Sequence, residues 1–156
     1  MIILGIDPGF GRLGYAVIKS EKNDIQVVDC ACFETSSNQK HEKRLVLVAD
    51  KVKGLLLKHR PQALAIEKIF FAKNQKTALQ IAEVRGILLY LAASSDVSIY
   101  EFTPLEVKMA LTGYGKATKD QVQKMLKILL KLQSLPKSDD AADALAISLT
   151  CATCYP

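Results

Sequence analysis

Asp7 is an acidic residue at a point in the chain where an unpaired carboxylate is costly. It ends an apolar run, Ile2 to Ile6, and is followed at once by Pro8 and Gly9. An apolar run with such boundaries predicts a strand that is buried on both faces. Burying an ionised carboxylate without partners costs several kcal/mol or raises its pKa. Asp7 must therefore find cations, hydrogen-bond donors or a metal ion.

Three further acids stand at comparable positions. The short run Ala63 to Ile66 predicts a second buried strand, which ends in Glu67. Asp140 and Asp143 are one helical turn apart at the start of a predicted helix, where backbone amides and the helix dipole favour negative charge. Helix capping alone would be the simpler explanation of this pair. Together with the two strand ends, however, the pair predicts acidic side chains that converge at one edge of a sheet.

This set of acids suits one kind of chemistry. Carboxylate oxygens are the ligands that Mg²⁺ and Mn²⁺ prefer. Two such ions about 3.5 to 4 Å apart can hold a phosphodiester in line with an attacking water molecule. The sequence is therefore compatible with metal-dependent hydrolysis of a phosphodiester.

The elements that must position the acids follow from hydrophobic periodicity and capping signals. Strands are predicted over residues 2–7, 13–19, 25–34, 63–67 and 97–102, the first three as an antiparallel meander. Helices are predicted before Pro61, over 75–94, after the capping boxes at Thr103 and Thr118, and from Asp140 onward. This order predicts an α/β layered fold in which helices flank a mixed five-stranded sheet, within a single domain over residues 1–156.

Composition narrows the possible partners. The formal charge of +5 and the pI of about 9.0 favour an anionic partner such as nucleic acid. No apolar run approaches the roughly 18 to 20 residues of a membrane span, and Asp7 follows the first apolar run too soon for a signal peptide. We therefore expect a cytoplasmic protein with no membrane partner.

The cysteines form two closely spaced pairs, Cys30 with Cys32 and Cys151 with Cys154. Such spacings can bind zinc, but buried free cysteines are common small core residues. Each pair is predicted to lie on one face of its strand or helix, so we favour core packing.

Four stretches of the chain, in this order, resemble the RuvC family of Holliday-junction resolvases, which have a ribonuclease H-like fold. The matching stretches are Ile3 to Gly9 with Gly14-Tyr15, Ala65-Ile66-Glu67 with Phe70 to Asn74, Val107-Lys108 with Gly113, and Asp140 to Ala146. The resemblance spans nearly the whole chain. It implies an Mg²⁺-dependent endonuclease of DNA recombination and repair that resolves four-way junctions by paired symmetric nicks. It also implies two metal ions per active site, with Mn²⁺ as a substitute.

The resemblance assigns roles residue by residue. Asp7, Glu67, Asp140 and Asp143 become the catalytic acids that bind the metal. Lys108 and Lys119 are placed at the DNA backbone beside them, and Lys116, in the loop between these two lysines, joins this group. Phe70 matches an aromatic that the family inserts near the junction crossover, where stacking is worth about 1 to 3 kcal/mol per base. Lys73 and Asn74, in the same stretch, are assigned to DNA binding.

The implied partners are four-way junction DNA and a second copy of the chain, and the sequence leaves open whether a branch-migration motor docks on the protein. The helix predicted over 75–94 supports a partner independently, because its apolar residues wrap more than one face from Ile87 onward. One departure concerns Phe10, which stands where the family usually has a small hydroxyl residue. This difference leaves open whether the local phosphate contact expected of the family is made.

Three other interpretations remain open from the sequence. The nearer alternative is a ribonuclease H-like nuclease of the YqgF type, linked to ribosomal RNA processing, although the stretch Phe70 to Asn74 and the helix start Asp140 to Ala144 favour the RuvC type. A non-catalytic junction-binding module would share the basic surface without the chemistry. Asp-Pro-Gly after a buried strand also resembles the first phosphate loop of actin-like ATPases, but 156 residues do not supply the second lobe that those proteins need.

Overall fold

A mixed five-stranded sheet forms the centre of the computed structural model, which describes residues 1–22, 24–68 and 75–155, with residues 75–77 described by their backbone only. The strand order is β3-β2-β1-β4-β5. The strands β1 (Ile2–Asp7), β2 (Arg12–Glu21) and β3 (Asp24–Glu34) are antiparallel neighbours. The strands β4 (Ala63–Glu67) and β5 (Ser98–Phe102) continue the sheet parallel to β1. The predicted mixed sheet is confirmed.

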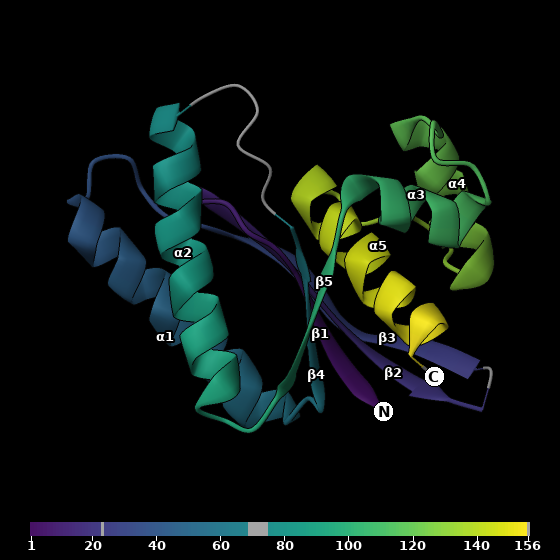
Figure 1. Ribbon diagram of the computed structural model, residues 1–156, viewed down its shortest axis with the longest axis horizontal. Helices are drawn as coiled ribbons and strands as arrows, with labels where there is room; N and C mark the ends of the chain where they lie inside the picture. The colour runs from purple at the N-terminus through teal and green to yellow at the C-terminus, as the bar shows by residue number, and fades with distance from the viewer. Residues whose placement is uncertain (23, 69–74, 156) are drawn as a thin grey trace.

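Helices cover both faces of this sheet (Figure 1). The helices α1 (His41–His59) and α2 (Gln75–Ala93) lie on one face. The helix α5 (Asp139–Cys154) crosses the other face, next to α3 (Pro104–Thr112) and α4 (Lys119–Leu129). The capping boxes predicted at Thr103 and Thr118 are both present, and each starts its helix at the expected residue.

Strand alternation decides which way the strand-end acids point. Successive side chains of a strand face opposite sides of the sheet. In β1, Leu4 and Ile6 belong to the core under α1 and α2, whereas Ile3 belongs to the core under α5. Asp7 follows the period of Ile3 and Gly5, and it therefore faces α5.

The strand β4 repeats this arrangement. Leu64 and Ile66 pack toward α1 and α2, whereas Ala63 and Ala65 pack toward α5. Glu67 follows the alanines and also faces α5. Because β1 and β4 are parallel neighbours with Ile6 opposite Ile66, both acids leave the sheet at the same edge.

Small residues allow α5 to lie unusually close to the sheet. A Cβ atom built on Gly5 would lie 2.7 Å from the Cβ of Ser148 in α5. A Cβ on Gly14 would overlap the backbone carbonyl of Asp140 and lie 3.0 Å from its Cβ. Gly14 is also the residue that pairs with Asp7 across β1 and β2. The close approach therefore sets the first turn of α5 beside Asp7.

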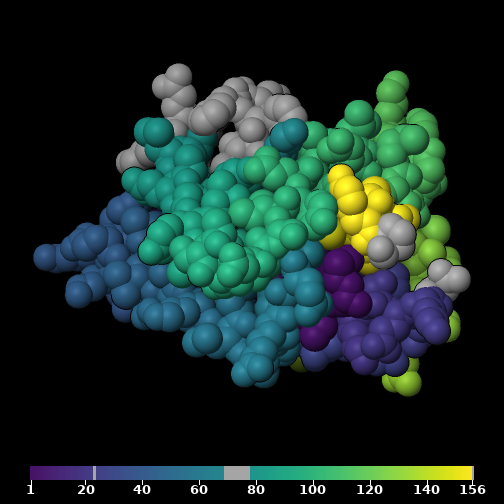
Figure 2. Space-filling model, turned by 60° about the horizontal axis from the view of Figure 1, so that its bottom comes forward, coloured from purple at the N-terminus to yellow at the C-terminus, as the bar shows by residue number. Residues whose placement is uncertain are grey.

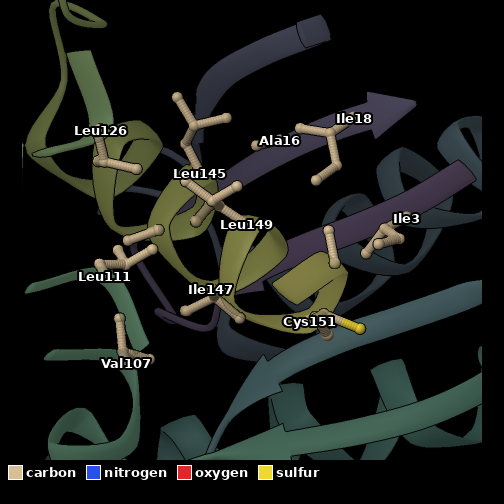
Figure 3. Close-up of a cluster of buried hydrophobic side chains, with 14 of the residues drawn as sticks. Ile3, Ala16, Ile18, Val107, Leu111, Leu126, Leu145, Ile147, Leu149 and Cys151 are labelled. Carbon is tan, nitrogen blue, oxygen red and sulfur yellow. The ribbon is translucent and has the colours of Figure 1, made fainter. Parts of the chain in front are cut away.

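Leucines along α5 complete this core (Figure 3). Leu145 and Leu149 lie toward the strand residues Ala16 and Ile18, whereas Ile147 lies on the side of α3. All of these side chains are buried. Figure 2 looks onto the edge where β1 begins, and there the first residues of β1 lie beside the end of α5. The helix is thus packed against the sheet from its first turn to Ala152.

Several sequence-based expectations need correction. The helix α5 begins at Asp139 rather than Asp140, with Ser138 as its N-cap. Of the cysteines, Cys151 is buried but Cys154 is exposed, so the second pair does not share a buried face. Cys30 and Cys32 are half-buried on β3, next to the first turn of α5. Among the residues that the structure describes, no helix is both long enough and apolar enough to span a bilayer.

The apolar residues of α2 separate into two groups. Val84, Leu88 and Ala92 are fully buried against the sheet. Leu79 and Tyr90, by contrast, are 65% and 69% exposed. The expectation that the apolar surface of α2 covers more than one face is confirmed for its described side chains.

The close packing of α5 predicts a large effect of a single methyl group. Gly5→Ala should lower the free energy of unfolding by about 1 to 3 kcal/mol, because α5 must move away from β1. Gly54→Ala is the matched control. Gly54 is in the interior of α1, and no atom lies within 4 Å of the place where its Cβ would be, so alanine should stabilise by about 0.5 to 1 kcal/mol. Urea unfolding measures both, and equal effects of the two substitutions would contradict the packing argument.

Candidate active site

The strand ends and the start of α5 enclose a groove of about 240 Å³. Glu67 and Asp143 line it together with Lys108 and Lys119. Its apolar lining comes from α3, α4 and α5 and consists of Pro104, Val107, Val122, Ala146 and Ile147. The structure thus brings two predicted acids and two predicted lysines to the same groove.

Asp7 is buried close to three other carboxylates. Burial raises its pKa to about 7, and the negative charges of Glu67, Asp143 and Asp140 act in the same direction. Only Lys119 among the contributing groups acts in the opposite direction. All four predicted acids therefore lie close enough to interact electrostatically.

Glu67 and Asp143 are perturbed in the same way. Burial raises the pKa of Glu67, and the charge of Asp143 raises it further. Burial also raises the pKa of Asp143, but Lys119 lowers it through a 3.3 Å contact between Nζ and Oδ2. Lys119 makes a second contact of 3.2 Å with Asp139, whose side chain is largely exposed. One lysine thus neutralises part of an acidic cluster.

Asp140 is held by groups that sequence reasoning missed. Its Oδ2 atom lies 2.9 Å from Nη2 of Arg12 and accepts a 3.1 Å hydrogen bond from the hydroxyl of Ser138. The thiol of Cys32 lies 3.6 Å from the same oxygen. Every one of these contacts involves Oδ2, so Oδ1 keeps no partner among the described residues. The sequence alone gives no signal for the Arg12 contact, because Arg12 and Asp140 are distant in the chain and meet through the packing of α5 on β2.

Arg85 is a second residue that sequence reasoning missed. From α2 it donates a 2.8 Å hydrogen bond to the backbone carbonyl of Glu67, and it forms an ion pair of 2.5 Å with Glu101 of β5. Its side chain is 14% exposed. Arg85 thereby links α2 to the end of β4. An arginine inside an apolar helix was the available signal, because a buried charge requires a partner.

The structure places only some of the predicted DNA-binding residues at the groove. Lys108 and Lys119 face the groove. Lys116 is exposed in the connection between α3 and α4 and does not line it. Phe70, Lys73 and Asn74 lie outside the described residues.

The donor set fits a divalent cation, although the acids do not form a closed cage. Within the described ranges, no group of three His, Cys, Asp or Glu side chains is arranged to hold a metal ion. The ion pairs explain this, since Asp143 contacts Lys119 and Asp140 contacts Arg12. The uncompensated charge around Asp7, and the hard oxygen ligands, are what Mg²⁺ would satisfy.

The fold and the four acids at one sheet edge define a ribonuclease H-like protein. The structure superposes on the "Thermus thermophilus RuvC structure" with a TM-score of 0.91 and 33% identity, over 98% of this chain and 94% of that one. It also matches "T. thermophilus RuvC in complex with Holliday junction substrate", with a TM-score of 0.93, 32% identity and coverage of 98% and 93%.

Sequence comparisons identify the family. The family model described as "Crossover junction endodeoxyribonuclease RuvC" matches residues 3–151. The protein of that name from Petrotoga mobilis is 44% identical over 94% of this chain and 90% of its own length. The protein of the same name from Natranaerobius thermophilus is 43% identical over 99% of this chain and 96% of its own length. The chain belongs to the RuvC family of crossover junction endodeoxyribonucleases.

The electrostatics of Asp7 predict that the site lowers the stability of the metal-free fold. The pKa of Asp7 is about 7 in the folded state, above its ordinary value of 3.8. The free energy of unfolding that Asp7 contributes is therefore lost as the pH rises from 3.8 to about 7. Above that range, Asp7→Asn should increase the free energy of unfolding by about 1 to 3 kcal/mol. Asp120→Asn, at an exposed acid paired with Lys124, is the control and should change it by less than about 0.5 kcal/mol. Chemical denaturation at a pH of about 8 with a chelator measures both, and a destabilised Asp7→Asn protein would contradict this electrostatic argument.

Proposed function

We propose that this chain is a structure-selective endonuclease that resolves four-way DNA junctions by paired symmetric nicks. The observation that carries the proposal is the placement of Asp7 and Glu67 at the ends of two neighbouring parallel strands, beside Asp140 and Asp143 in the first turns of α5. Membership of the RuvC family supports it, as does the solved complex of a relative with a Holliday junction. The reaction is attack of a water oxygen on phosphorus, with cleavage of one P–O bond in each nicked strand.

We assign Mg²⁺ to this site, two ions per active site, with Mn²⁺ as a substitute. When bound, the metal supplies charge neutralisation and lowers the pKa of the attacking water. Asp7 and Glu67 are the fixed ligands in this proposal, because rigid parallel strands place them. Asp140 offers its Oδ1 atom, since Arg12 and Ser138 already contact its Oδ2.

Lys119 has two alternative anionic partners in this proposal. In the free protein it contacts Asp143 and Asp139. When DNA enters the groove, its ammonium group can transfer to a backbone phosphate, leaving the carboxylate of Asp143 available to the metal. Lys108, which lines the same groove, contacts the DNA backbone as well. Lys116 is exposed beyond the groove and extends this basic surface along the DNA strand.

We also propose that two copies act together, since two opposing strands of a symmetric junction must be cut. The exposed stripe Leu79, Glu83, Gly86 and Tyr90 on α2 supports an interface there. Leu88 is buried within the chain and is not part of it. Light scattering tests the dimer, and a monomer at micromolar concentration would contradict it. Stacking by Phe70, DNA contacts from Lys73 and Asn74, and docking of a branch-migration motor stay predictions.

Removing any one of the four acids should separate cleavage from binding. Asp7→Asn, Glu67→Gln, Asp140→Asn and Asp143→Asn should each abolish nicking of a synthetic four-way junction with Mg²⁺. Junction affinity should be unchanged or higher, because the loss of negative charge cannot weaken attraction to phosphate. The matched control is Asp120→Asn, which should nick normally. Substantial nicking by Asp7→Asn would falsify the proposal.

The lysines predicted to contact DNA should affect the salt dependence of junction binding. Replacing Lys108, Lys116 and Lys119 by alanine should flatten the slope of log affinity against log salt by about 0.9 for each lost phosphate contact. Lys124→Ala, which removes a charge already paired with Asp120, is the control. If the triple variant keeps the wild-type slope, these lysines do not contact the DNA.

A further inference from the structure

A third arginine, Arg44, is held in a fixed position near the catalytic edge on the side of the sheet covered by α1 and α2. Its guanidinium lies 4.0 Å from the centroid of the Phe10 ring. Its Nε donates a 2.9 Å hydrogen bond to the hydroxyl of Thr35, which in turn lies 3.2 Å from the carbonyl of Phe10. The Phe10 ring also stacks on His41 at 4.6 Å. Arg44 is therefore oriented by Thr35, which follows β3, and by Phe10 in the loop that follows Asp7.

The terminal nitrogens of Arg44 have nothing to bind within the described chain. Arg12 and Arg85 each contact a carboxylate, but no ion pair or hydrogen bond involves Nη1 or Nη2 of Arg44 among the described residues. Within the same residues, no buried side-chain nitrogen lacks a partner, so these two atoms are accessible to solvent. A guanidinium fixed on one side and open on the other is suited to bidentate binding of an anion.

The surroundings of Arg44 add to this positive charge. Lys40 and Lys43 lie beside it at the start of α1, where Glu42 is the acid of the first turn. Basic residues at this end of a helix oppose its dipole, so helix stability does not explain them. His41 contacts Glu83 of α2 at 2.6 Å, whereas neither lysine has an ion pair among the described residues.

The position of Arg44 near the strand end that carries Asp7 indicates which anion it would bind. Phe10 is three residues after Asp7, so their Cα atoms lie within about 11 Å of each other. The first turns of α1 and α5 lie at the same edge of the sheet (Figure 1). Lys108 and Lys119 occupy the α5 side of that edge, and Arg44 occupies the opposite side.

We propose that Arg44 binds a phosphate of the DNA backbone on the α1 side of the active site, opposite the groove lysines. This inference rests on the proposed function. It also gives a role to Phe10, whose ring lies against the guanidinium of Arg44. The DNA is then held on both sides of the four acids.

Methylphosphonate linkages test the contact, because each removes the charge of one backbone phosphate. The substitution Arg44→Gln keeps an N–H donor for the hydroxyl of Thr35 and loses the positive charge and the two terminal nitrogens of the guanidinium. It should weaken binding of a synthetic four-way junction by about tenfold and reduce the salt slope by about 0.9. At one linkage of the junction, a methylphosphonate should weaken binding by the wild-type protein but leave binding by the Arg44→Gln variant unchanged. The same methylphosphonate should still weaken binding by the variant in which Lys108 and Lys119 are replaced by alanine.

Two further variants separate this contact from general charge effects. Arg44→Lys should keep the salt slope but lose affinity, since an ammonium cannot reproduce the bidentate geometry. Lys53→Ala, which removes an exposed charge farther along α1, should show no linkage-specific loss of sensitivity. If every methylphosphonate affects wild type and Arg44→Gln equally, Arg44 binds no phosphate. If the wild-type protein neither binds nor nicks the junction, the proposed function itself fails.

Discussion

The close contact between α5 and the sheet is the constraint that positions the four acids at one edge of the molecule. Gly5 and Gly14 leave no side chain between the strands and the helix, so the first turn of α5 lies against the residue paired with Asp7. Leu145 and Leu149 then bury the remainder of the helix. The site is therefore built on rigid elements, and the acids keep their relative positions without a flexible loop between them.

This arrangement brings like charges together at the expense of stability. Asp7 experiences three neighbouring carboxylates in a buried place, and its pKa rises accordingly. Arg12 and Lys119 each neutralise one acid from the side, at Asp140 and Asp143 respectively. Folding alone would not select such a cluster, since uncharged residues would pack there more favourably. The cluster is what a cation-binding function requires.

Much of this could be predicted from the sequence, for identifiable reasons. Apolar runs that end in Asp7 and Glu67 indicate where carboxylates leave the sheet, and period-two alternation places both on the same face. The capping boxes at Thr103 and Thr118 located two helix starts correctly. Arg12, Arg85 and Arg44 could not be assigned, because their partners are distant in the chain and depend on strand register and helix packing.

Diffraction from crystals soaked in Mn²⁺, with the metal located by its anomalous scattering, would show directly whether the four acids form a cation site. We expect a peak in contact with the carboxylate of Asp7, further contacts to Glu67 and to the acids of α5, and Asp143 released from Lys119. A protein that binds Mn²⁺ only elsewhere, with the Lys119 to Asp143 contact intact and no peak at Asp7, would contradict a cation-binding role for this cluster.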